Sequence, residues 1–208
     1  RPPRSTLFPY TTLFRSPPAL HARVLARVLS AAVNGIEAFP VEVEVNAGYG
    51  DTTIVIVGLP DAAVKESRDR VSTALGNSGY RVPMGRTTIN LAPADVRKEG
   101  PSFDLPIAVG TLAASEQLET PRLDDFLLVG ELALTGAVRP VKGVLPIALR
   151  ARAEGRRGLL VAVENAPEAA VVEGLEIIAV RNLREAADFL AGGIQGAPTR
   201  VDLAHPFE

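Results

Sequence analysis

The side chains that most often carry catalysis are scarce in this sequence of 208 residues. It contains no cysteine, which excludes a thiol nucleophile, thiolate metal ligands and disulfides. Its two histidines, His21 and His205, lie near opposite ends, and neither belongs to a His-x-x-x-His or similar ligand spacing. The sequence therefore predicts no metal site and no cysteine-based catalysis.

Glycine-containing turns could bind nucleotide phosphates, but none here has the required pattern. No G-x-x-x-x-G-K-[ST] loop occurs and the dipeptide Gly-Lys is absent, so this chain cannot itself be a P-loop ATPase. The stretch AGYGDTT has Gly48 and Gly50 but lacks the third glycine of a dinucleotide-binding turn. We therefore predict a turn between two strands there and assign no cofactor to this chain.

Basic residues between positions 61 and 99 could bind DNA phosphates. Seven lysines and arginines stand there against five acidic residues, a local excess of two positive charges. Loops present unpaired donors, so cations on the loop after the strand 86–91 and on that strand are the favoured contacts. On the helix 62–78, ion pairs at helical spacing on a solvated face are an open alternative. The candidate DNA contacts are Arg86, Arg97, Lys98, Lys65 and Arg68.

The composition fits a folded domain, with 47% hydrophobic residues and a net charge of -2. This balance argues against intrinsic disorder and against a generally basic nucleic-acid binder. Residues 6–16, TLFPYTTLFRS, resemble the translation of a common sequencing adapter. We therefore leave residues 1–16 out of the fold as non-native, and the remainder has a net charge of about -5. With no membrane-spanning run and no signal peptide, we expect a cytoplasmic protein without a membrane partner.

Alternating and apolar runs predict an α/β domain over residues 22–192. Helices are expected over 62–78, capped by Asp61, over 104–115 and over 144–155, and strand and helix alternate from 158 to 190. Strands are expected over 25–35 and 40–48, over 52–60 as a run that ends in a turn, over 86–91, and over 126–134 and 135–141 as a hairpin. Residues 193–208 are expected to be a linker. The predicted core contains Val55, Val57, Ile89, Leu91, Ile107, Val129 and Leu132.

Three long sequence segments carry a family resemblance: VGLPDAAVKESRDRV, INLAPADVRKEGPSFDLPIA and VGELALTGAVRPVKGVLP. In this order and spacing, over residues 24–192, the chain resembles the amino-terminal domain of the YifB/ComM family, the magnesium-chelatase-like AAA+ ATPases. The resemblance implies a fold like the Lon protease carboxy-terminal domain, of the ribosomal protein S5 domain 2 type. It further implies a following AAA+ module that binds ATP and Mg²⁺, a ring of subunits expected to be a hexamer, and branch migration of DNA in natural transformation.

The segments KEGPS and GAVRPVKG also resemble the catalytic region of Lon proteases, in which a serine nucleophile is activated by a lysine. Ser102 occupies the serine position, but the lysine position holds Leu145, and Lys142 stands three residues earlier. A serine hydroxyl is a weak nucleophile without a neutral base nearby. We therefore expect a non-catalytic domain in which Ser102 or Asp104 caps the following helix. A peptidase using Ser102 and Lys142 is the alternative.

Overall fold

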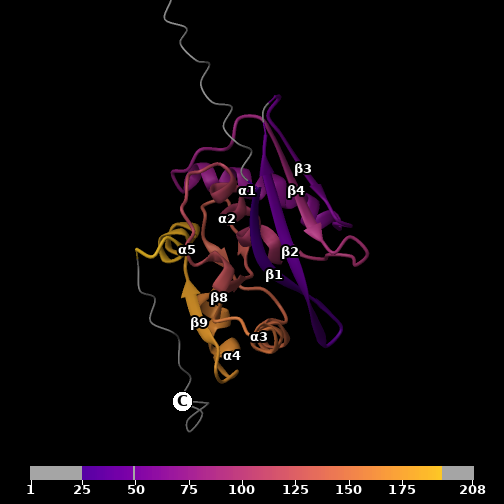
Figure 1. The fold of residues 1–208 in the computed structure, drawn as a ribbon, viewed down its shortest axis with the longest axis vertical. Helices are drawn as coiled ribbons and strands as arrows, with labels where there is room; N and C mark the ends of the chain where they lie inside the picture. Colours follow the sequence, from indigo (N-terminus) through magenta and orange to yellow (C-terminus); the bar gives the residue numbers. More distant parts are fainter. Residues whose placement is uncertain (1–24, 49, 194–208) are drawn as a thin grey trace, which may run out of the picture.

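The computed structural model describes residues 25–48 and 50–193. The predictions for residues 1–16 and for most of the linker 193–208 lie outside the described residues, and the domain bounds 22 and 192 stay predictions. The elements form a mixed α/β fold built on one large sheet (Figure 1). This agrees with the fold class expected from the sequence.

The large sheet has seven strands in the order β3-β4-β2-β1-β5-β8-β9. Only β2 runs antiparallel to its neighbours, and every other pair is parallel. The strands are β1 Leu25–Asn34, β2 Glu37–Ala47, β3 Thr53–Val57, β4 Arg86–Ala92, β5 Phe126–Leu128, β8 Gly158–Ala162 and β9 Glu176–Val180. A separate two-stranded ribbon joins β6 Glu131–Leu132 to β7 Val138–Arg139.

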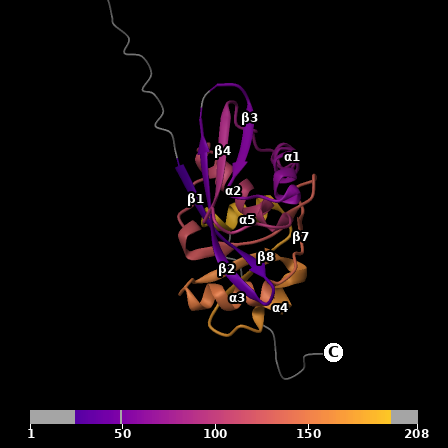
Figure 2. The same cartoon turned by 90° about the vertical axis from the view of Figure 1, so that its right-hand side faces the viewer.

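Helices cover the two faces of the sheet unequally. They are α1 Ala62–Asn77, α2 Asp104–Ala114, α3 Val144–Ala153, α4 Ala166–Ala170 and α5 Leu183–Leu190, with 3₁₀ turns at Pro101–Phe103, Leu123–Asp125 and Val163–Asn165. Helices α1, α2 and α5 share one apolar core with the sheet, and α3 and α4 share a second core on the other face. Figures 1 and 2 show α1 beside β3 and β4, and α3 and α4 at the opposite end of the molecule.

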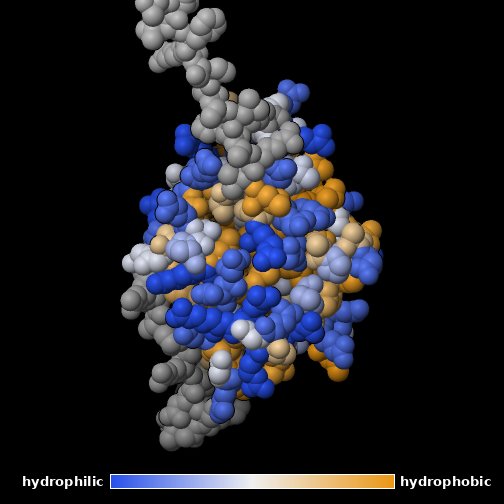
Figure 3. All heavy atoms as spheres, viewed as in Figure 1, coloured by the Kyte–Doolittle hydropathy of each residue, from blue (hydrophilic) through white to orange (hydrophobic). Residues whose placement is uncertain are grey.

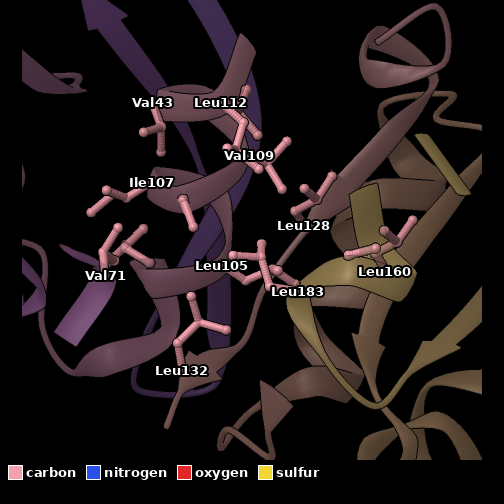
Figure 4. Close-up of a cluster of buried hydrophobic side chains, with 14 of the residues drawn as sticks. Val43, Val71, Leu105, Ile107, Val109, Leu112, Leu128, Leu132, Leu160 and Leu183 are labelled. Carbon is pink, nitrogen blue, oxygen red and sulfur yellow. The ribbon is translucent and has the colours of Figure 1, made fainter. Parts of the chain in front are cut away.

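This unequal covering explains the residue patterns of the strands. In β2, Val41, Val43 and Val45 are buried while Glu42 and Glu44 are half-buried, because helices cover only one face of this strand's central part. All five residues of β8 are buried, because that strand has helices on both faces. Figure 4 shows the larger core, in which side chains of β2, α1, α2, β5, β8 and α5 point toward one another.

Two residues of the predicted core are not in it. Val55 is half-buried and Val57 is 41% exposed, because these two side chains lie on the face of β3 that points away from the core, beside the half-buried Thr88 and Asn90 of β4. Ile54 and Ile56 pack against the core instead. The other predicted core residues, Ile89, Leu91, Ile107, Val129 and Leu132, are buried.

The predicted strand 126–134 is divided in two. Its chain leaves the large sheet at Gly130, where the Gly130 N–H donates to the Ser102 carbonyl at 2.9 Å. The following β6 then pairs only with β7, through the turn at Gly136 that the sequence predicts. Within the described residues, none of the helices combines the length and apolarity needed to cross a bilayer.

Candidate functional site

The loop between β4 and α2 is tied to the start of α1 by backbone hydrogen bonds. The Lys98 N–H donates to the Leu59 carbonyl at 3.1 Å, and the Asp61 N–H donates to the Lys98 carbonyl at 3.0 Å. The Asp61 carboxylate accepts from the Val64 N–H at 2.7 Å, which confirms the predicted helix cap, and also from the Gly100 N–H at 3.2 Å. One carboxylate therefore joins the helix start to the loop.

Lys98 is fully buried in this loop, although it is one of the candidate DNA contacts. Its ammonium group donates to the Pro93 carbonyl, so the side chain closes the loop on itself. Burial lowers the pKa of Lys98, and the nearby Asp95 opposes that shift. The structure contradicts the prediction that Lys98 contacts phosphate from a mobile loop, because its ammonium group faces the protein and not the solvent.

The other candidates near this loop are exposed. Arg97 faces Glu99 at 3.4 Å, and Arg68 faces Asp69 at 3.2 Å. The hydrogen bond and the charge of Asp69 raise the pKa of Arg68. Lys65 is exposed and makes no ion pair among the described residues. The expected ion-paired, solvated face therefore describes Arg68, whereas Lys65 keeps an available charge.

Arg86 stands apart from this group. It begins β4, whereas the loop with Arg97 follows the end of the same strand, about 20 Å away at 3.3 Å per residue. The Arg86 side chain is exposed, and its carbonyl accepts from the Gly48 N–H at 2.8 Å. The structure therefore brings Lys65 and Arg97 to one end of the sheet and places Arg86 at the other. On the face seen in Figure 3, hydrophilic residues predominate, with hydrophobic ones interspersed.

Asp104 forms a buried polar cluster that the sequence reasoning missed. Its carboxylate is fully buried and accepts from the Ser67 hydroxyl, from Arg70 Nε at 2.7 Å and from the Leu132 N–H at 3.1 Å. The hydrogen bond to Asp104 is the largest cause of the raised pKa of Arg70. The signal was available, since a lone carboxylate in an apolar helix needs a buried partner.

This cluster corrects the predicted cap of α2. The residue preceding α2 is Phe103, and no side chain caps the helix there. Asp104 instead joins α1, α2 and β6 through the three partners described above. The Ser102 hydroxyl makes no hydrogen bond among the described residues.

The serine and lysine of the predicted alternative are not joined. Ser102 is half-buried in the 3₁₀ turn before α2, and Lys142 is exposed in the turn before α3. No hydrogen bond of the Lys142 ammonium exists within the described part of the chain. At the position of the Lon lysine, Leu145 is 37% exposed, and its N–H donates to Glu168 at 3.0 Å. The described residues therefore hold no serine-lysine pair.

Comparison with known proteins gives this geometry its context. The family model described as subunit ChlI of Mg-chelatase matches residues 41–165. The chain belongs to the Mg-chelatase subunit ChlI family. The matched region includes β4, the loop with the buried Lys98, the Asp104 cluster, and the Ser102 and Lys142 positions.

Relatives of this ChlI-family chain are much longer than the chain itself. It is 46% identical to YifB of Escherichia coli over 168 residues, which are 81% of this chain and 33% of that protein. The same values hold for the competence protein ComM of Haemophilus influenzae. A more distant match is Lon protease 2 of Bacillus subtilis, 27% identical over 165 residues, 71% of this chain and 29% of that protein. The chain spans about a third of the length of YifB and ComM.

The matched family is named for a Mg-chelatase subunit, but the described side chains form no magnesium site. Among residues 25–48 and 50–193, no three His, Cys, Asp or Glu side chains are grouped as metal ligands. The buried carboxylate of Asp104 already accepts from Arg70, Ser67 and a backbone amide. These side chains do not fit a magnesium ion. A cavity of about 360 Å³ between β1 and α2 is lined by Leu25, Ala113 and Leu123, among others, and carries no such group.

Proposed function

We propose that this ChlI-family domain is a non-catalytic module that serves assembly or DNA engagement in a longer ATPase of the YifB/ComM type. The observation that carries the proposal is the surroundings of Ser102. A serine nucleophile needs a base within hydrogen-bond reach, and here the matching position holds Leu145. Lys142 is exposed in the turn before α3, and within the described residues its ammonium group makes no hydrogen bond to the Ser102 hydroxyl.

The 46% identity to YifB and ComM supports the wider proposal. In it, a separate AAA+ module binds ATP and Mg²⁺, and the subunits form a ring, expected to be a hexamer, in the cytoplasm. The substrate of the longer protein is then branched DNA taken up in natural transformation. The present domain supplies none of the phosphate-binding groups of an ATPase.

Exposed cations supply the DNA-engaging part of the proposal. Arg86 and Lys65 are exposed and make no ion pairs among the described residues, while Arg97 has Glu99 beside it. Three or four phosphate contacts on residues 17–208, whose net charge is about -5 (19 bases against 24 acids), give non-specific binding of roughly 10⁻⁴ M at physiological salt. Several copies in a ring would strengthen this binding by avidity.

Two measurements on the 208-residue chain test the proposal. The first is fluorescence anisotropy with a labelled branched DNA at two salt concentrations, for the unaltered chain and for Arg86→Ala. We expect weak, salt-sensitive binding that the substitution weakens further, and a complete lack of binding at low salt would refute DNA engagement. The second is cleavage of fluorogenic casein by the unaltered chain and by Ser102→Ala. Serine-dependent cleavage would establish the peptidase and overturn the non-catalytic proposal.

A further inference from the structure

The loop that leads into β4 presents an apolar side chain between two arginines. Its sequence from Arg81 to Arg86 is RVPMGR, and we call these six residues the Met84 tip. Met84 is the single methionine of the chain and is 90% exposed. Arg81 and Arg86 are exposed on either side of it. A large apolar side chain held this far into water gains nothing within the folded domain.

Hydrogen bonds hold the Met84 tip at both ends. The side chain of Gln117 accepts from the Arg81 N–H and donates to the Arg81 carbonyl, each at 2.8 Å. At the other end the Gly85 carbonyl accepts from the Thr53 N–H at 3.2 Å. Gly85 has φ of +123°, which a residue with a side chain rarely adopts. The tip is therefore a preformed projection at the end of the sheet where β3 and β4 begin.

The charges of the tip are available to a ligand. Neither Arg81 nor Arg86 makes an ion pair within the described residues, in contrast to Arg97 and Arg68. Asp51, in the adjoining β2–β3 loop, is exposed and pairs with neither arginine. Two free guanidinium groups on either side of an apolar point match a polyanion that has an apolar interior.

Duplex DNA has this arrangement, with phosphates outside and stacked bases within. Proteins that bend DNA insert Met, Pro, Leu or Phe between base steps while basic side chains contact the groove and backbone. We infer that the Met84 tip is a DNA wedge: Met84 enters a base step, and Arg81 and Arg86 neutralise the phosphates that flank it. The inference rests on the proposed DNA engagement and adds a mode of contact to it. Branched DNA suits such a wedge, because stacking is already interrupted at the junction.

A second exposed residue provides a matched control. Ile36 is also 90% exposed, but it lies in the turn between β1 and β2, next to Gly35 and Glu37. Ile36 is as exposed as Met84 and similar to it in size, but no arginines flank it. Removing the Ile36 side chain should change neither DNA binding nor base unstacking.

The test uses the 208-residue chain and a branched DNA carrying 2-aminopurine at the junction, whose fluorescence rises when the base unstacks. Binding is followed in parallel by anisotropy at low salt. For Met84→Ala we expect the fluorescence rise at saturation to fall at least about 5-fold while the dissociation constant changes less than about 3-fold. Met84→Leu should retain the rise, and Ile36→Ala should match the unaltered chain.

The possible results distinguish failure of the wedge from failure of the proposed DNA engagement. Binding without any rise in fluorescence, or an equal loss of the rise in Ile36→Ala, would overturn the wedge and leave DNA engagement standing. Absence of binding by anisotropy would overturn both. Thermal unfolding of each variant shows that it is folded, and we expect unchanged melting because neither side chain packs in the core.

Discussion

Two loops flank β4, and their basic residues have opposite surroundings. The loop before the strand, ending in the Met84 tip, exposes Arg81 and Arg86 and leaves them without ion pairs in the described structure. The loop after the strand buries Lys98 and places Glu99 beside Arg97. The adjacent Arg97 and Lys98 make the second loop a candidate for phosphate binding when the sequence alone is considered. In the fold, the first one has the available charges.

The difference comes from what lies next to each loop. The loop after β4 crosses the start of α1, whose Asp61 and Leu59 take up its backbone groups and draw the lysine stem into the packing. A lysine stem is apolar over four carbons, so it can fill such a space if its ammonium finds an acceptor. The loop before β4 extends beyond the end of the sheet, and its arginines remain in solvent. A basic residue in a loop therefore indicates binding only where the fold leaves it facing outward.

The largest effect on stability should follow from truncating the buried Lys98 side chain. Lys98→Ala removes a fully buried stem and leaves the Pro93 carbonyl without its donor. We expect a loss of about 3 kcal/mol in the free energy of unfolding, measured by urea denaturation. Lys98→Met keeps most of the volume and should cost less than about 1.5 kcal/mol. If Lys98→Ala were as stable as the unaltered chain, the stem would not support the loop.

Asp61 should have the next largest effect. Asp61→Ala removes the acceptor for two backbone amides, those of Val64 and Gly100. We expect a loss of about 1 to 2 kcal/mol in urea denaturation, the usual range for a helix cap. Asp51→Ala is the matched control, since this exposed carboxylate accepts no hydrogen bond among the described residues, and it should change stability by less than about 0.5 kcal/mol. Equal losses in the two variants would contradict the role of Asp61.

The two loops should also differ in DNA binding. Arg86→Ala should leave the unfolding free energy unchanged, weaken binding about 5-fold, and lower the slope of log affinity against log salt by about one. Arg97→Ala should weaken binding about 2-fold, because Glu99 already neutralises part of its charge. Anisotropy titrations at several salt concentrations check both values. A larger effect of Arg97 than of Arg86 would reverse the comparison.

The sequence predicts local features of this fold well. The alternation of Val43 and Glu44 indicates a sheet face covered on one side, and Asp61 before an amphipathic run indicates a helix start; both are confirmed. Each of these signals depends on residues a few positions apart. The exposure of Val57 could not be predicted in the same way, because it depends on which face of β3 packs against the helices.

The candidate site shows the same division more sharply. The sequence alone shows that a catalytic lysine is missing, because Leu145 stands at the position of the Lon lysine. It does not show that Lys98 faces inward or that Asp104 meets Arg70, because each depends on how α1 lies against the loop and α2. Side-chain direction is a property of packing between distant segments. Residue type and spacing alone therefore cannot separate the buried Lys98 from the exposed candidates Arg86 and Lys65.

The buried Lys98 should also make the free energy of unfolding depend on pH, and this is the smallest effect that we expect. Burial lowers its folded-state pKa below the ordinary value of 10.5, so between those two values the unfolded chain binds more protons than the folded one. Stability contributed by this group therefore rises as pH increases across that interval, and below the folded pKa the penalty for burying the charge is fully present.

The measurement is the difference in unfolding free energy between the unaltered chain and Lys98→Met, from pH 7 to pH 10.5. We expect the unaltered chain to gain on the variant as pH rises, since only the lysine loses a proton. Tyr80 acts in the opposite sense, because burial raises its pKa above 10.0 and its contribution falls at alkaline pH. It is present in both proteins and cancels in the difference. A difference that stays constant with pH would mean that the Lys98 ammonium is as well solvated as an exposed one, and the contrast between the two loops would then rest on Arg97 and its ion pair alone.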